Sequence, residues 1–228
     1  IDDLSLVITT AIPASTDHYR TIATGVWSNP SLWETSVTGG DPWVAAIVPP
    51  TSAANTITIR NGHTVTIDAN TSADQLTIQN GGNLIYSAGI FTIDDGTGDD
   101  VNIQNGGIFT LSFLSNLPTF SGAGATVNVS TGGILRLTVG GLTTAAPALS
   151  VNSNNFVYQP QSILEWAPPG FGTFSTSDVI YFPNVDAVTI PIFRSSNPVQ
   201  IAVGGGLGNN TIINGVFECN GNVVWQNA

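Results

Sequence analysis

Apolar and polar residues alternate along much of this chain, and in its first two-thirds the alternation forms a recurring eleven-residue pattern. The pattern is apolar-x-apolar-x-(Asn/Thr)-Gly-x-x-apolar-x-apolar. Four copies begin at Ile57, Leu76, Val101 and Val127, and a weaker fifth copy begins at Leu149. The starts lie 19, 25, 26 and 22 residues apart, which is the length that one turn of a β-solenoid needs.

Each copy separates an apolar face from a polar one. In the first copy the isoleucines and the valine point to one side, and the threonines between them point to the other. The corner between the two strands needs a residue that tolerates positive φ, which Gly supplies and Asn accepts better than most. If the copies stack, their second apolar positions form an internal ladder with a spacing of ~4.8 Å. The ladder predicted in this way contains Ile59, Ile78, Ile103, Val129 and Val151.

A β-hairpin is the alternative for each copy. A two-residue Asn-Gly turn would pair Ile59 with Thr64 and turn the apolar residues of the two strands to opposite faces, so the simple hairpin fails. A three-residue loop with a bulge would pair Ile57 with Val65 and restore the common face. Stacked bulged hairpins therefore remain an alternative to the solenoid.

The pattern predicts an all-β fold, a right-handed parallel β-helix of about eight coils with an N-terminal cap. Residues 1–18 are expected to form a leading strand, Leu4 to Thr10, and a linker, and residues 19–228 a single domain. Within that domain we expect a Trp-rich cap at 19–50, regular coils at 57–160 and irregular coils at 161–228. No window has a capped 3.6-residue period, so helix content should be very low.

The amino-acid composition excludes several classes of partner. The chain has 15 acidic residues, four arginines and no lysine, for a net charge of −11, which argues against nucleic acid and anionic membranes as partners. Cys219 is the single cysteine, so the chain forms no internal disulfide. No apolar run reaches the ~18 residues of a membrane span. We expect a mature protein or a piece of a longer one, without membrane insertion.

One stretch resembles a known family. The segment Gly25–Glu34 (GVWSNPSLWE), the pair Pro49-Pro50 and the unit Ile57–Asp68 (ITIRNGHTVTID) are similar to the opening of the eight-glycine domain family. They also resemble the start of β-helical modules in large secreted or surface proteins of Bacteroidota. The resemblance covers about residues 19–138. It implies an extracellular parallel β-helix used in surface display, adhesion or glycan contact, and it carries over no catalytic residue.

Two clusters are candidate ligand sites. Trp27, Trp33 and Trp43 could form a flat platform for sugar rings, although a cap that buries them for stability is the interpretation we favour. A loop between the second and third copies concentrates carboxylates beside glycines and could bind Ca²⁺, which takes six to eight oxygen ligands. Its order matches neither an EF-hand nor a calcium-binding β-roll, so we expect a solvated loop with Ca²⁺ as the alternative. The carboxylates are Asp94, Asp95, Asp99 and Asp100.

Catalysis is not expected. The arginines are scattered along the sequence, and Glu165 and Asp178 show no pairing that would suggest the two carboxylates of a glycoside hydrolase. The sequence thus predicts a non-enzymatic structural or adhesion module of a secreted or cell-surface protein. Its expected partners are other surface proteins, neighbouring domains of the same polypeptide or extracellular glycans. The alternative is a carbohydrate-binding or polysaccharide-processing β-helix, with a polysaccharide lyase or glycoside hydrolase left open.

Overall fold

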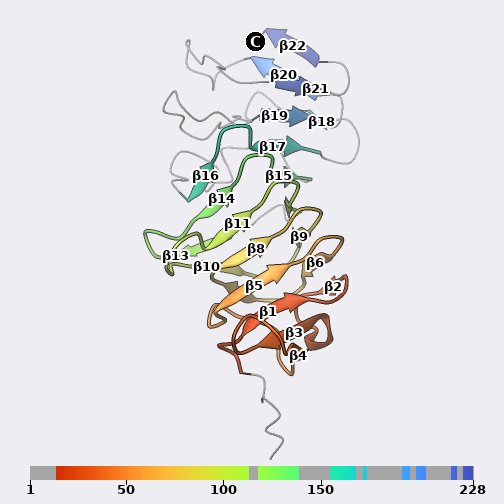
Figure 1. Cartoon of the computed structure of the whole chain (residues 1–228). Helices are drawn as coiled ribbons and strands as arrows, with labels where there is room; N and C mark the ends of the chain where they lie inside the picture. The colour runs from red at the N-terminus through yellow and green to blue at the C-terminus, as the bar shows by residue number, and fades with distance from the viewer. Residues whose placement is uncertain are drawn as a thin grey trace, which may run out of the picture.

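The computed structural model describes residues 14–112, 118–138 and 155–167, and beyond them the strands at 172–173, 192–195, 199–203, 217–219 and 223–227. The described residues are nearly all β, and the 3-10 turn η1 (Pro30–Leu32) is the only helix among them. Figure 1 shows the strands lying one above another along the molecule. The predicted strand at 4–10 lies outside the described residues.

The strands form two large sheets and two small ones. The first sheet has the order β16-β14-β11-β8-β5-β1-β3-β4 and the second the order β2-β6-β9-β12-β15-β17-β19-β21. The third is β13-β10-β7 and the fourth β18-β20-β22. The bounds in the first sheet are β1 (His18–Thr21), β3 (Trp33–Ser36), β4 (Val44–Ala45), β5 (Thr56–Ile59), β8 (Leu76–Ile78), β11 (Val101–Ile103), β14 (Val127–Val129) and β16 (Phe156–Tyr158). Those in the second are β2 (Gly25–Val26), β6 (Thr64–Ile67), β9 (Asn83–Tyr86), β12 (Ile108–Leu111), β15 (Ile134–Leu137), β17 (Ile163–Trp166), β19 (Ile192–Ser195) and β21 (Phe217–Cys219). The small sheets contain β7 (Thr71–Ala73), β10 (Phe91–Asp94), β13 (Thr119–Ser121), β18 (Gly172–Thr173), β20 (Val199–Val203) and β22 (Val223–Asn227).

Pairing between repeats is parallel and in register. Strands β5 and β6 of one repeat belong to different sheets, and each pairs with the equivalent strand of the next repeat. The hairpin alternatives are therefore wrong for the described repeats. The antiparallel pairs described are β1 with β3 and β3 with β4, both at the N-terminal end.

The predicted internal ladder is confirmed for its first four members. Ile59, Ile78, Ile103 and Val129 are consecutive partners and none is exposed. The fifth member is wrong, because Val129 pairs with Tyr158 rather than with Val151. The reason lies at the corner: Gln161 adopts the left-handed φ of 63° that glycines adopt in the earlier repeats, so the true fifth copy has no Gly to mark it.

The segment after β1 covers the N-terminal end of this core. Strand β1 pairs in parallel with β5, and the antiparallel strands β3 and β4 follow it outward. Trp27 and Trp33 are 2% and 0% exposed and their rings meet edge to face at 5.1 Å. Edge-to-face contact is a favoured geometry for buried aromatic rings. A buried tryptophan pair therefore forms part of the core at this end.

Candidate functional site

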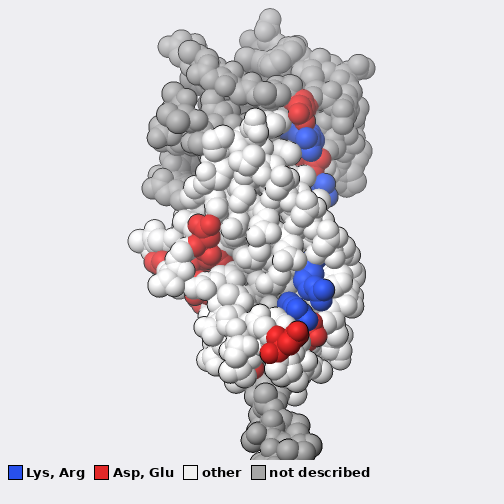
Figure 2. All heavy atoms as spheres, in the orientation of Figure 1, with Lys and Arg blue, Asp and Glu red and all other residues white. Residues whose placement is uncertain are grey.

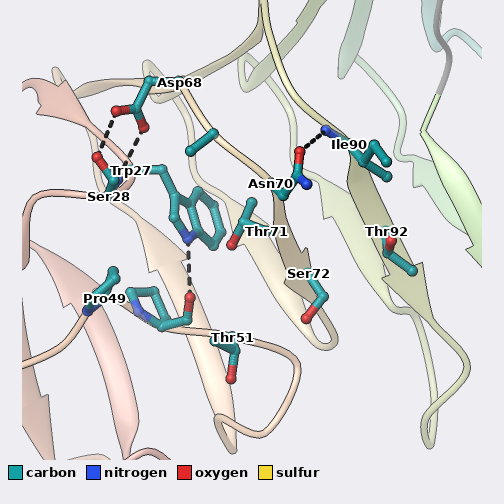
Figure 3. A pocket seen from close by; sticks show the side chains of 12 residues that line it. Trp27, Ser28, Pro49, Thr51, Asp68, Asn70, Thr71, Ser72, Ile90 and Thr92 are labelled. Carbon is teal, nitrogen blue, oxygen red and sulfur yellow. Dashed lines mark hydrogen bonds between the residues drawn. The ribbon is translucent and has the colours of Figure 1, made fainter.

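An open groove of about 500 Å³ lies beside this tryptophan pair. Its walls come from residues 27–28 after β2, the loop 49–51, the segment 68–72 that leads into β7, and Ile90 and Thr92 of the following repeat. Figure 3 shows these side chains around the opening. The volume falls within the roughly 300–1,000 Å³ range of small-ligand sites.

Hydrogen bonds from Trp27 hold both β6 and the proline loop (residues 49–51) beside the groove. Its backbone amide donates to the carbonyl of Thr66 at 2.8 Å, which continues the pairing of β2 with β6. Its indole Nε1 donates to the carbonyl of Pro50 at 3.0 Å and so holds the proline loop in place. The indole of Trp33 in turn donates to the carbonyl of Trp27 at 3.1 Å. The buried tryptophans therefore hold the lining segments in place by hydrogen bonds from their indoles to backbone carbonyls.

The three tryptophans proposed as a sugar platform do not share an exposed surface. Trp27 and Trp33 lie in the core, and Trp27 reaches the groove with only the 2% of its surface that is exposed. Trp43 is half-buried, and the guanidinium carbon of Arg20 lies 3.8 Å from its ring centroid. A cation so placed occupies the ring face that a sugar would need.

Asp68 is the one ionisable side chain among the described residues that line the groove. It accepts hydrogen bonds from the amide of Ser28 at 3.1 Å and from its hydroxyl at 2.5 Å. Partial burial pushes the pKa of Asp68 upward, but the two bonds from Ser28 outweigh it and lower the pKa below its ordinary value. A lone ionised carboxylate offers no acid–base pair for hydrolysis.

The remaining polar groups of the groove are neutral. Asn70 accepts a hydrogen bond from the amide of Ile90 at 2.9 Å through Oδ1, which turns its amide nitrogen outward as a free donor within the described structure. Thr71 and Thr92 are half-buried, and neither hydroxyl has a hydrogen-bond partner among the described residues. Ile90, at 50% exposed, adds apolar surface beside them. Sequence reasoning missed this groove because its parts come from segments with no common motif.

Three of the four carboxylates in the candidate calcium loop accept hydrogen bonds, each from different residues. Asp95 accepts from the amide of Gly124 at 3.0 Å, and Asp99 accepts from the side-chain amide of Asn128 at 2.9 Å. Asp100 is buried and accepts from the amides of Gly96 at 2.8 Å and Thr126 at 2.6 Å. Asp94 ends β10.

The bonds from Gly124, Thr126 and Asn128 tie the loop to the next repeat, and the bond from Gly96 lies within the loop. Across the part of the chain that the structure describes, no three His, Cys, Asp or Glu side chains come together in a group that could hold a metal.

Asp74 lies beside Asp100 and was not singled out by the sequence. Its pKa is raised, first by burial, then by a hydrogen bond and charge repulsion from Asp100, and further by the charge of Asp94. Its Oδ1 is buried without a hydrogen-bond partner among the described residues. Folding therefore favours the neutral form of Asp74.

The arginines, which are scattered along the sequence, each have an acidic partner in the structure. Arg20 and Arg60 both contact Glu34, Arg136 pairs with Glu165 at 2.5 Å, and Arg194 pairs with Glu218 at 2.7 Å. The last four residues are consecutive partners on β15, β17, β19 and β21, so charges of opposite sign alternate along the second sheet. Figure 2 shows the alternation as a column of blue and red atoms at upper right.

We call the column of Arg136, Glu165, Arg194 and Glu218 the charge ladder. Its first pair could have been predicted from the register of the repeat. Arg136 and Glu165 both occupy the position between the last two apolar residues of their copies, once the fifth copy is placed at Phe156. Equivalent positions of stacked repeats become direct neighbours. The misplaced fifth copy therefore concealed the pair.

Comparison of the chain with protein-family models, with curated proteins and with solved structures found no match. Over the described residues, the structure has no helix of the length and apolar character that crossing a membrane would require.

Proposed function

We propose that this chain is a right-handed parallel β-helix that serves as a non-enzymatic structural or adhesion module of an extracellular or cell-surface protein. The observation that carries the proposal is the in-register parallel stacking of successive repeats around one apolar core. A stack in which each repeat contacts its neighbours forms a stiff scaffold, since stability comes from every interface between repeats.

Chain connectivity supports the solenoid and its handedness. The repeats that begin with β5, β8 and β11 each contribute one strand to the first sheet, one to the second and one to the third before the chain returns to the first. Connections between parallel strands of the same sheet are right-handed in about 98% of cases, because the twist of the strands favours that hand. A right-handed coil is therefore the expected path.

The chemistry of the outer faces supports a role outside the cell. Outward positions of β5, β6 and β8 carry threonines that are half-buried, while the interior positions between them are fully buried. The chain has no lysine and a net charge of −11, so its solubility rests on uncharged polar groups and carboxylates. Such a surface suits contact with other surface proteins, with neighbouring domains of the same polypeptide or with glycans.

The absence of an acid–base pair in the groove supports a non-enzymatic role, since Asp68 stands there without a second ionisable group among the described lining residues. An assay for release of reducing ends or unsaturated products from polysaccharides should therefore give no turnover. Turnover that Asp68→Asn abolishes would contradict this part of the proposal.

The location and the handedness need separate tests. Antibody labelling of intact, unpermeabilised cells of the source organism should mark the surface, and labelling confined to permeabilised cells would contradict the extracellular role. An experimental structure decides the hand of the coil. A left-handed path, or repeats that do not coil, would overturn the solenoid without bearing on where the protein is located.

A further inference from the structure

We infer that the groove between Trp27, the proline loop and β7 is a binding site for a short stretch of a neutral glycan. The site deepens the contact with glycans proposed above, on which it rests, by naming one surface and one class of ligand. It is carried by three properties of the groove: unpaired neutral hydrogen-bonding groups, the lack of positive charge and an edge that is closed to peptide strands.

The hydrogen-bonding groups match those of a sugar. The hydroxyls of Thr71 and Thr92 can each donate and accept, and the Asn70 amide nitrogen donates while its oxygen is held by the amide of Ile90. Asp68 keeps acceptor capacity beyond its two bonds from Ser28. A sugar chain presents vicinal hydroxyls that need both donors and acceptors, and this set supplies both within one opening.

The groove also offers apolar surface for the faces of sugar rings. Ile90 is 50% exposed, and Ala69 and Pro49 line the same opening. Because Trp27 is almost entirely buried, no aromatic ring is available for stacking, and we expect weak binding with a Kd of about 1 mM.

Charge excludes other ligand classes. No Arg, Lys or His lines the groove among the described residues, so nothing compensates the charge of a phosphate, sulfate or uronic acid. One carboxylate is too few for a calcium site, which needs six to eight oxygens around the ion. The lining therefore favours a neutral, hydroxyl-rich ligand over a phosphate, a sulfate, a uronic acid or a calcium ion.

A peptide could also bind by adding a strand to the edge of a sheet, but the edge of β7 is obstructed. Strand β7 ends the third sheet, and its free edge faces the loop at 49–52. The amide of Ser52 donates to the Ser72 hydroxyl at 3.2 Å, and that hydroxyl donates to Ser52 Oγ at 2.9 Å, so a side-chain bridge spans the edge. An added peptide strand would need that edge for its backbone hydrogen bonds.

The test is an NMR titration of the isotope-labelled protein with neutral tetrasaccharides of β-1,4-linked glucose, mannose and xylose, at concentrations up to about 10 mM. At least one should shift the amide signals of residues 69–72 and 90–92. Tetragalacturonate, of the same length but acidic, should bind more weakly than the best neutral chain.

Variants then locate the site. Thr71→Val with Thr92→Val keeps side-chain shape and strand propensity but removes both hydroxyls, and should weaken binding by about tenfold. Ala69→Leu fills the groove from an exposed position and should abolish binding without touching a hydroxyl. The matched control is Thr77→Val, a half-buried outward threonine on β8, which should leave binding unchanged.

Binding that is lost in both groove variants and kept in Thr77→Val supports the site. No shift with any neutral tetrasaccharide, preference for tetragalacturonate, or equal binding by wild type and both groove variants would overturn it. Circular dichroism and the melting temperature of each variant verify that the fold is retained, and a second groove variant is available should the first fail to fold.

Discussion

Gly107 lies so close to the carbonyl oxygen of Ile78, one repeat earlier, that a Cβ atom at its position would come within 2.5 Å of that oxygen. Gly82 and Gly133 stand in the same relation to the carbonyls of Ile59 and Ile103, at 2.9 and 2.4 Å. In these three Gly-Gly pairs the second glycine therefore allows the close approach of one repeat to the next. The first glycine has a different role, since it adopts a positive φ at the corner.

This difference predicts unequal effects for two similar substitutions. Gly107→Ala should lower the free energy of unfolding by about 3 kcal/mol, because its methyl group overlaps backbone that cannot rotate away. Gly62→Ala should cost only about 1 kcal/mol, the strain of a left-handed φ. A Cβ at Gly62 meets nothing within 4 Å.

Urea unfolding of the two variants checks the prediction, with the slope of the transition confirming that the same surface is exposed. Equal losses in the two variants would mean that φ strain alone governs the corner and that the repeats can separate to admit a methyl group.

The sequence pattern predicted the all-β class and the partners of its most regular positions. It succeeded from Ile59 to Val129 because alternation and an Asn-Gly or Thr-Gly corner were both present in those repeats. It failed at the fifth repeat because Gln161 occupies the left-handed corner and Pro160 stands where Asn is found earlier. The corner requires a left-handed backbone conformation with positive φ. A residue other than glycine can adopt this conformation when contacts with the stacked neighbours offset its strain.

The groove was beyond prediction from sequence for a different reason. Its walls are brought together by the indole bond from Trp27 to Pro50 and by the stacking of Thr92 beside Ser72 on neighbouring strands. Neither relation follows from spacing along the chain. The tryptophans stood out in the sequence, but Trp27 and Trp33 are buried and stabilise the core, so they offer no ring face to a ligand.

The charge ladder predicts a second pair of unequal effects. The Glu165 side chain is 7% exposed and its partner Arg136 is 29% exposed, whereas Arg194 and Glu218 are 29% and 41% exposed. Glu165→Gln should reduce the free energy of unfolding by about 2 kcal/mol, because it leaves a partly buried guanidinium without a counter-charge. Glu218→Gln should cost less than about 1 kcal/mol, as exposed pairs do.

A double-mutant cycle with Arg136→Gln isolates the pair itself, provided that each single variant still unfolds cooperatively. A coupling energy near zero for Arg136 and Glu165 would show that Glu165 is held by its surroundings and that the pair does not contribute to stability.

Calcium should leave the protein unchanged. The carboxylates of Asp95, Asp99 and Asp100 each accept a hydrogen bond from a different residue of the next repeat, so no common centre faces them. An ion that bound the folded state would raise the melting temperature in proportion to the logarithm of its concentration. We expect the same melting temperature with Ca²⁺ and with a chelator, and a rise that grows with Ca²⁺ concentration would restore the metal site.

Asp74 makes stability depend on pH in a direction opposite to that of most carboxylates. Burial, together with Asp100 and Asp94, raises its pKa, so folding favours its neutral form. Its contribution to stability is fully present below the unfolded pKa of ~3.9 and is lost as pH rises through the higher folded value. Asp74→Asn fixes a neutral group in the same shape and provides an N–H donor toward Asp100.

The variant should therefore melt at a higher temperature than the wild type near neutral pH, and the difference should shrink as the pH falls and disappear below about pH 4. Melting curves by circular dichroism at a series of pH values measure it. Asp99→Asn is the matched control, because it removes a charge of the same sign from the same loop and Asp99 is not among the groups that raise the pKa of Asp74. If both variants gain equally at neutral pH, the cause is the net charge of −11 rather than the contact between Asp74 and Asp100.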